Sequence, residues 1–156
     1  MLKGEFDSLA MDLKTGDYVM LIRRNNDERL IPIWIGSYEA FSIALGLTGV
    51  QPPRPLTHDL ILNIIEAIGG EITSIVITGI RENTYFALIH IDRGEVESYV
   101  IDARPSDSTA LAIRAGCPIF VSEEIESFDL DNPTDDLSKE FSERLRKITP
   151  EELIGF

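Results

Sequence analysis

Stretches that favour β-strands occur in runs in this chain, and each run is followed by a stretch with helical spacing. Residues rich in Val, Ile and aromatic side chains predict strands over 4–13, 17–24, 29–35, 71–80, 84–92, 96–102 and 118–121. Apolar residues three or four positions apart predict helices over 37–47, 58–68 and 106–115. Because the strands do not alternate one by one with helices, this order predicts an α+β fold with mixed or antiparallel strands and about three core helices.

The order also contains a loose internal repeat. A strand at 29–35 leads into a helix that opens at Ser37, and a strand at 96–102 leads into a helix that opens at Ser106. Self-similarity of this kind is typical of duplicated units, although few residues match between these two. The sequence is therefore compatible with an internal strand–helix duplication.

The chain divides into a body and an acidic C-terminal part. Residues 1–125 hold all the expected strands and core helices, so we predict that they form the functional domain. Residues 126–156 are predicted to be an acidic linker and one amphipathic C-terminal helix, whose apolar face is Leu137, Phe141, Leu145 and Ile148.

Charge and cysteine usage limit the class of protein. The net charge of −13 argues against strong non-specific binding to nucleic acid, which needs Lys and Arg at the phosphates. Residues 122–156 carry 11 acidic and 4 basic residues, so a local basic site in the body remains open. No apolar run reaches the roughly 18 residues of a membrane span, and the first residues lack a signal-peptide core. The single cysteine, Cys117, rules out an intrachain disulfide, and we expect a cytoplasmic protein.

Two short segments combine proline, arginine and groups able to do chemistry. They are Pro-Arg-Pro-Leu-Thr-His-Asp at 53–59 and Asp-Ala-Arg-Pro-Ser-Asp at 102–107. Proline restricts its own φ and disfavours helix in the residue before it, so both segments should be rigid lead-ins to helices. Thr57 and Ser106 then suit helix N-caps.

These segments supply candidates for phosphodiester cleavage. His58 can act as general acid or base near neutral pH. Carboxylates can hold Mg²⁺ or Mn²⁺, or can simply favour a helix start, and the candidates are Glu39, Asp59, Asp102 and Asp107. Arg54 and Arg104 can each bind a phosphate or form an ion pair between loops. The ion pair is favoured for Arg104 and the phosphate contact for Arg54.

For three further residues we expect a structural role. His90 lies in an apolar strand, and two histidines are too few for a multi-histidine zinc site. Trp34 is expected to pack in the core, with stacking on a nucleobase as the alternative. Cys117 is expected to be a small buried residue.

Three motifs together resemble the bifunctional nuclease family, a bacterial domain formerly of unknown function. They are Ile-Pro-Ile-Trp-Ile-Gly with Glu39 and Ala40, and the two segments at 53–59 and 102–107. They occur in the family's order, and the resemblance spans roughly residues 2–125. It implies DNase and RNase activity and a homo-oligomer, most simply a dimer.

The resemblance also implies which residues form the site. The catalytic candidates are His58, Asp59, Glu39, Asp102 and Asp107, and the substrate-binding candidates are Arg54, Arg104 and Ser106. Any metal would be Mg²⁺ or Mn²⁺, and the residues holding it are left unassigned. We therefore expect a metal-assisted or histidine-assisted nuclease that binds nucleic acid at a local, weak site. The alternative is a non-catalytic homo-oligomeric binding or regulatory module, in which the arginine–carboxylate clusters hold loops or a partner.

Overall fold

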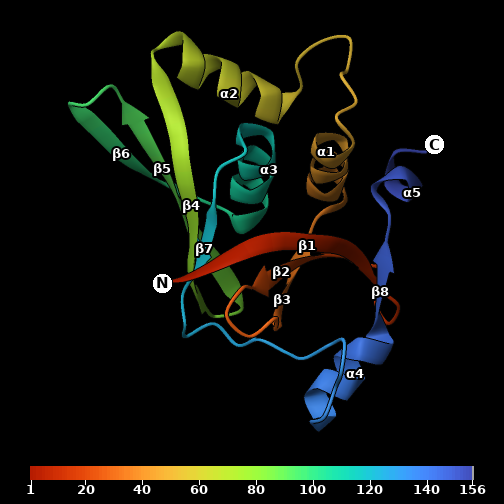
Figure 1. Ribbon diagram of the computed structural model, residues 1–156. Helices are drawn as coiled ribbons and strands as arrows, with labels where there is room; N and C mark the ends of the chain where they lie inside the picture. The colour runs from red at the N-terminus through yellow and green to blue at the C-terminus, as the bar shows by residue number, and fades with distance from the viewer. Residues whose placement is uncertain (156) are drawn as a thin grey trace.

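The computed structural model describes residues 1–155 and shows an α+β fold, as predicted (Figure 1). Its strands are β1 (Leu2–Asp12), β2 (Tyr18–Arg24), β3 (Leu30–Ile35), β4 (Gly70–Arg81), β5 (Thr84–Arg93), β6 (Glu97–Ala103), β7 (Ile119–Val121) and β8 (Leu145–Ile148). Its helices are α1 (Ser37–Thr48), α2 (Thr57–Ala67), α3 (Pro105–Ala115), α4 (Asp136–Arg144) and α5 (Pro150–Ile154). Every strand and helix expected in the body is present, with bounds shifted by one or two residues.

Two antiparallel meanders join into one sheet. The strand order is β3-β2-β1-β7-β4-β5-β6, and β8 pairs with β1 beside this path. The short strand β7 links the two meanders because it pairs antiparallel with β1 and parallel with β4. The first meander, β1–β3, continues into α1, and the second, β4–β6, continues into α3. This repeated order agrees with the strand–helix duplication expected from the sequence.

Helices α1 and α3 pack side by side over the sheet, and α2 crosses above them (Figure 1). Small residues let the pair approach closely: Ala40 and Ala44 of α1 and Ala110 of α3 are all buried. A Cβ atom on Gly46 would come within 2.9 Å of Arg114 Nη1. The helices therefore meet along their whole length, which brings the polar groups of both into contact. No helix within residues 1–155 combines the length and the apolar character needed to cross a membrane.

The C-terminal segment contacts both faces of the sheet: α5 packs against α1 on the helix-covered face, and α4 packs on the opposite face. There Phe141 of α4 packs against a second apolar cluster, which includes Val19, Leu21 and Leu30. The expected single C-terminal helix ends at Arg144, because residues 145–148 form β8 against β1. Leu145 and Ile148 are buried in that strand instead of extending a helical stripe. The division of the chain at residue 125 stays a prediction.

Helices α2 and α3 begin earlier than the expected caps. The N-cap residues are Leu56 and Arg104, so Thr57 and Ser106 lie inside the first turn. In α3 this follows from Pro105, whose fixed φ suits the first helical position. In α2 the Asp59 side chain accepts a hydrogen bond from the Leu56 backbone N–H at 3.0 Å. This bond makes Leu56 the N-cap, so the first helical residue is Thr57.

Candidate functional site

Arg104 connects the starts of α1 and α3. Its Nε lies 2.9 Å from Asp107 Oδ2, and its Nη1 lies 2.8 Å from Glu39 Oε1. The rigid Arg-Pro segment supplies this arrangement, because Pro105 starts the helix and places Asp107 one turn beyond Arg104. One guanidinium therefore holds two carboxylates that are 68 positions apart in sequence.

His58 lies behind this ion pair and links all three helices of the face. Its Nε2 is 2.9 Å from Asp107 Oδ1, and its Nδ1 is 2.6 Å from Ser42 Oγ. An ionised Asp107 accepts from Nε2–H, and a neutral imidazole then accepts the Ser42 hydroxyl proton at Nδ1. The His58 side chain is only 8% exposed, so both of its nitrogens are satisfied inside the protein.

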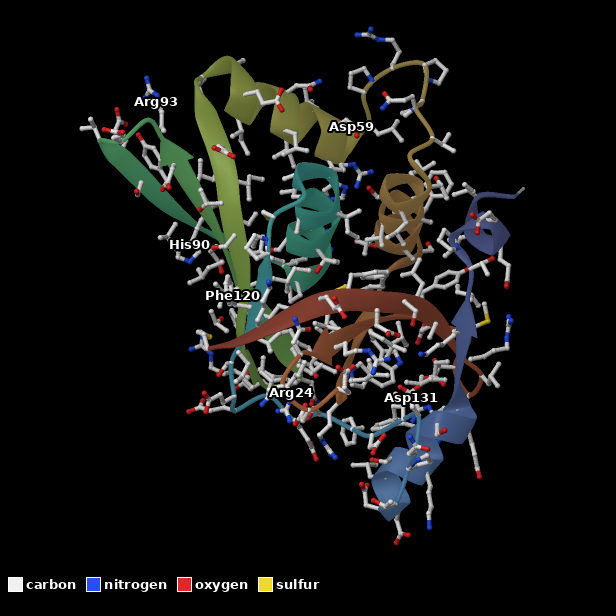
Figure 2. The ribbon with its side chains drawn as sticks, in the orientation of Figure 1. Arg24, Asp59, His90, Arg93, Phe120 and Asp131 are labelled. Carbon is white, nitrogen blue, oxygen red and sulfur yellow. The ribbon has the colours of Figure 1, made fainter. Side chains whose placement is uncertain are left out.

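Arg114 extends the network to Asp59. Its Nε donates to Asp59 Oδ1 at 3.0 Å, and its Nη2 donates to the backbone oxygen of Ser42 at 2.9 Å and to Ser42 Oγ at 3.2 Å. Asp59 lies at the start of α2, where that helix passes above α3 and α1 (Figure 2). A continuous hydrogen-bonded chain thus runs across three helices, in the order Glu39, Arg104, Asp107, His58, Ser42, Arg114 and Asp59.

The charges in this network stabilise the ionised carboxylates. Burial tends to raise the pKa of Asp107, but hydrogen bonds from Arg104 and His58 outweigh it and hold that pKa below its usual range. Burial also tends to raise the pKa of Asp59, but hydrogen bonds from the Leu56 amide and from Arg114 outweigh it and lower that pKa. The two carboxylates raise the pKa of Arg104. All three groups are therefore charged at neutral pH.

Five of the eight candidate site residues join this network, namely Glu39, His58, Asp59, Arg104 and Asp107. Ser106 lies beside it, buried, and lines a cleft together with Arg104. Asp102 and Arg54 do not join. Asp102 pairs with Leu88 on the sheet, so strand alternation directs it to the face opposite Ile89 and Ala103, which pack on the core.

Arg54 lies at the other end of α1 from Arg104. It belongs to the loop between α1 and α2, and within residues 1–155 its side chain has no ion pair or hydrogen bond. Its proline neighbours Pro53 and Pro55 line a separate groove with Asp59 and Arg114. The ion pair favoured for Arg104 is present, whereas the phosphate contact favoured for Arg54 stays a prediction.

Two members of the network were not predicted from the sequence. Ser42 lies one turn after Glu39 on α1, but a serine inside an apolar helix carries no distinguishing pattern. Arg114 is the basic residue of the last turn of α3, where a favourable interaction with the helix dipole already explains it. Both roles depend on how closely α1 and α3 pack.

The carboxylates do not form a ready metal site. Within the part of the chain that the structure describes, no group of three or more His, Cys, Asp or Glu side chains is arranged to hold a metal ion. Asp107 and Asp59 each share their oxygens with a guanidinium. A divalent ion would have to displace an arginine from either carboxylate.

The remaining candidates have packing roles. Trp34 was expected in the core but is exposed at the end of β3, where its Nε1 donates to Asp12 Oδ2 at 2.9 Å and its ring lies 5.9 Å from that of Phe141 between centroids. His90 lies on β5, well away from Asp59 (Figure 2). Cys117 was expected to be buried but is only half-buried, and this partial burial raises the pKa of its thiol.

Comparison with known proteins identifies the family. A sequence model of the bifunctional nuclease domain matches residues 19–128. An uncharacterized protein of Mycobacterium tuberculosis is 47% identical over 107 residues, which cover 69% of this chain and 63% of that protein. More distant relatives include bifunctional nuclease 1 of Oryza sativa, 23% identical over 69% of this chain and 33% of that protein.

Bifunctional nuclease 2 of Arabidopsis thaliana is 27% identical over 60% of this chain and 29% of that protein. The chain thus spans less than two thirds of the length of the curated relatives that it matches. The family match covers most of the body, including the network from Glu39 to Arg114. This chain belongs to the bifunctional nuclease domain family.

Proposed function

We propose that this protein hydrolyses phosphodiester bonds of nucleic acid at the cluster formed by Arg104, Asp107 and His58. The observation that carries the proposal is the Asp107 carboxylate, which accepts from a guanidinium on one side and an imidazole on the other. A base, a proton-sharing partner and a cation within hydrogen-bonding distance are the groups that such a reaction needs. The family match supports this choice of reaction.

Each residue has a distinct role in the proposed reaction. A water oxygen attacks phosphorus while the bond from phosphorus to one sugar oxygen breaks. Asp107 accepts the water proton, because its side chain is 30% exposed whereas His58 is buried. Arg104, with its side chain 63% exposed, stabilises charge on the non-bridging oxygens. His58 orients Asp107 and shares the proton, and the departing oxygen takes its proton from solvent.

Substrate binding would make Asp107 a better base. In the free protein Arg104 and His58 hold the pKa of Asp107 low, which weakens it as a proton acceptor. A bound phosphate would draw on the Arg104 guanidinium and add negative charge beside the carboxylate. Both effects raise the pKa of Asp107 toward the working pH.

Cleavage of labelled single-stranded DNA and RNA, with and without EDTA, tests the proposal. We expect the wild-type protein to cleave and His58→Ala to lower turnover, because Asp107 loses the partner that orients it and shares its proton. Circular dichroism must show both proteins folded at the assay temperature, because His58 is buried between helices. Equal rates in matched preparations would point to a contaminating nuclease and to a binding role for this protein.

A non-catalytic homo-oligomeric module is the second candidate, and the exposed strand β6 favours it. β6 is an edge of the sheet, and Tyr99, Val100 and Ile101 are all exposed on it. Antiparallel pairing of two copies about Val100 would place Tyr99 opposite Ile101 with no like charges opposite each other. A second set of exposed apolar residues recurs every four positions along α2 and its caps, namely Leu56, Leu60, Ile64 and Ile68.

We therefore expect a dimer at micromolar concentration in light scattering, at twice the 17.4 kDa mass of one chain. Val100→Lys should shift the protein to monomer, because two like charges would face each other at the symmetry axis. Val50→Lys, the same change at an exposed position after α1 and away from β6, is the matched control and should leave the dimer intact. A wild-type protein of 17.4 kDa alone would contradict the prediction.

A further inference from the structure

The hydrogen bond between His58 and Ser42 can run in either direction. Its two atoms, His58 Nδ1 and Ser42 Oγ, lie 2.6 Å apart, and each of them can donate or accept. If Ser42 donates, the ring proton of a neutral imidazole lies on Nε2. If Nδ1 donates instead, Nε2 carries no proton and turns a lone pair toward Asp107. The groups at the two ends of this part of the network decide between these arrangements.

Arg114 decides the direction at the Ser42 end. Its guanidinium can only donate, and its Nη2 lies 3.2 Å from Ser42 Oγ and 2.9 Å from the Ser42 backbone oxygen. The hydroxyl oxygen therefore accepts from Arg114, so the hydroxyl proton points away from the guanidinium. The other partner of this oxygen is His58 Nδ1, which accepts that proton.

Arg114 is held in one position by two further contacts. Its Nε donates to Asp59 Oδ1 at 3.0 Å, and its Nη1 donates to the backbone oxygen of Ala110 at 3.0 Å. The side chain is only 10% exposed, and a Cβ atom on Gly46 would lie 2.9 Å from Nη1. Asp59 comes from the end of α2 that is nearest α1 (Figure 2). Three helices thus fix the guanidinium, so the donor at Ser42 has a constant position and a constant charge.

Asp107 decides the direction at the other end. Its carboxylate is ionised beside Arg104 and can only accept, so the imidazole Nε2, at 2.9 Å, must carry a proton. Both ends therefore select the same neutral imidazole, protonated on Nε2 and unprotonated on Nδ1. The donors form a one-way chain from Arg114 to Asp107, and hydrogen bonds in such a chain strengthen one another.

We propose that Ser42 and Arg114 are positioning residues for the hydrolysis proposed above. They hold His58 as a neutral imidazole whose Nε2–H faces Asp107. The role in hydrolysis rests on that proposed function, whereas the position of the proton does not. The proton that His58 shares with Asp107 is then the one on Nε2. Because the imidazole stays a donor, it fixes the orientation of the carboxylate while a water proton is transferred to that carboxylate.

Nitrogen NMR of the intact ¹⁵N-labelled protein at neutral pH tests the position of the proton without any cleavage. Correlations between the ring nitrogens and the ring C–H protons show which nitrogen is protonated. His90→Gln assigns the signals, because His90 is the only other histidine of the chain. We expect a single neutral form of His58 with its proton on Nε2. A proton on Nδ1, or one on each nitrogen, would overturn the proposal.

Ser42→Ala tests whether the hydroxyl positions the ring. The fold should be kept, because Arg114 retains its bonds to Asp59, to Ala110 and to the backbone oxygen of residue 42. We expect the Nε2–H to exchange faster with solvent, and kcat for a labelled oligonucleotide to fall about tenfold with KM unchanged, the scale of one lost hydrogen bond. Ser37→Ala, the same change at an exposed position of α1, is the matched control and should behave as wild type. A folded Ser42→Ala protein with either wild-type exchange or wild-type kcat would overturn the proposal.

A double-mutant cycle tests the part played by Arg114. If the guanidinium acts through the Ser42 hydroxyl, Arg114→Met should lower kcat less in the Ser42→Ala background than in the wild type. All four proteins are compared at a temperature at which circular dichroism shows them folded, because Arg114 also pairs with Asp59. Additive losses would overturn the role of Arg114. A protein with the expected imidazole form that cleaves no nucleic acid would uphold the position of the proton and refute the nuclease function.

Discussion

Replacing Asp107 by Asn is expected to lower the rate of phosphodiester cleavage by roughly 10²- to 10⁴-fold, the range of a lost general base. The amide keeps the size of the carboxylate but cannot accept the proton of an attacking water. It also loses the charge that holds Arg104 Nε at 2.9 Å and His58 Nε2 at 2.9 Å. Single-turnover cleavage of a labelled oligonucleotide measures the chemical step directly.

Asp102→Asn is the matched control, since it makes the same chemical change five residues earlier in the same motif. The Asp102 side chain is exposed and forms no hydrogen bond or ion pair within residues 1–155, so its replacement should change the rate by less than about threefold. Equal losses in the two variants would show that cleavage does not depend on the network around Asp107. A normal rate for Asp107→Asn would remove Asp107 from the reaction.

Local sequence patterns predicted much of this site because the key residues follow rigid segments. Pro105 fixes the start of α3, so the spacing of Arg104 and Asp107 on the first turn follows directly from the motif. His58 and Asp59 begin α2 in the same way. The body strands were predictable for a similar reason, since their apolar patterns are bounded by turn residues.

The rest of the site depends on contacts between elements that are distant in sequence. The exclusion of Asp102 follows from the register of β6 against β5, which sets the face to which each side chain points. Ser42 enters the network because Gly46 lets α1 approach α3 closely. Strand β8 was expected as helix because its apolar residues continue the spacing of α4, whereas pairing with β1 decides its conformation. No local pattern contains these facts.

The pairing of β8 with β1 places Arg144 beside a carboxylate that the sequence did not single out. Asp12 is fully buried, and it accepts from Arg144 Nε at 2.8 Å, from Arg144 Nη2 at 2.7 Å, from Trp34 Nε1 at 2.9 Å and from the Lys14 N–H at 2.9 Å. Hydrogen bonds from Arg144 outweigh the effect of burial and hold the pKa of Asp12 far below its usual range. This ion pair joins the C-terminal segment to the sheet.

Arg144→Leu should therefore destabilise the protein by about 3 kcal/mol or more, the usual cost of leaving a buried charge without its partner. For a chain of this length that corresponds to a fall in Tm of roughly 6–12 °C. Thermal unfolding followed by circular dichroism measures it. Arg146→Leu, a change on the same strand at a half-exposed position paired with exposed Glu152, is the control and should cost less than about 1 kcal/mol.

The pH dependence identifies Asp12 as the group responsible. In the wild type its folded-state pKa lies below the unfolded value, so its contribution to stability is present above about pH 4 and is lost as pH falls through the folded pKa. Without Arg144, the largest effect that lowers the folded pKa is gone, so this pKa rises and Asp12 takes up a proton in the folded state at a higher pH than in the wild type. The stability deficit of Arg144→Leu relative to wild type should accordingly shrink between pH 7 and pH 4. A deficit that stays constant over this range would mean that lost packing by Arg144, and not the unpaired Asp12 carboxylate, causes the destabilisation.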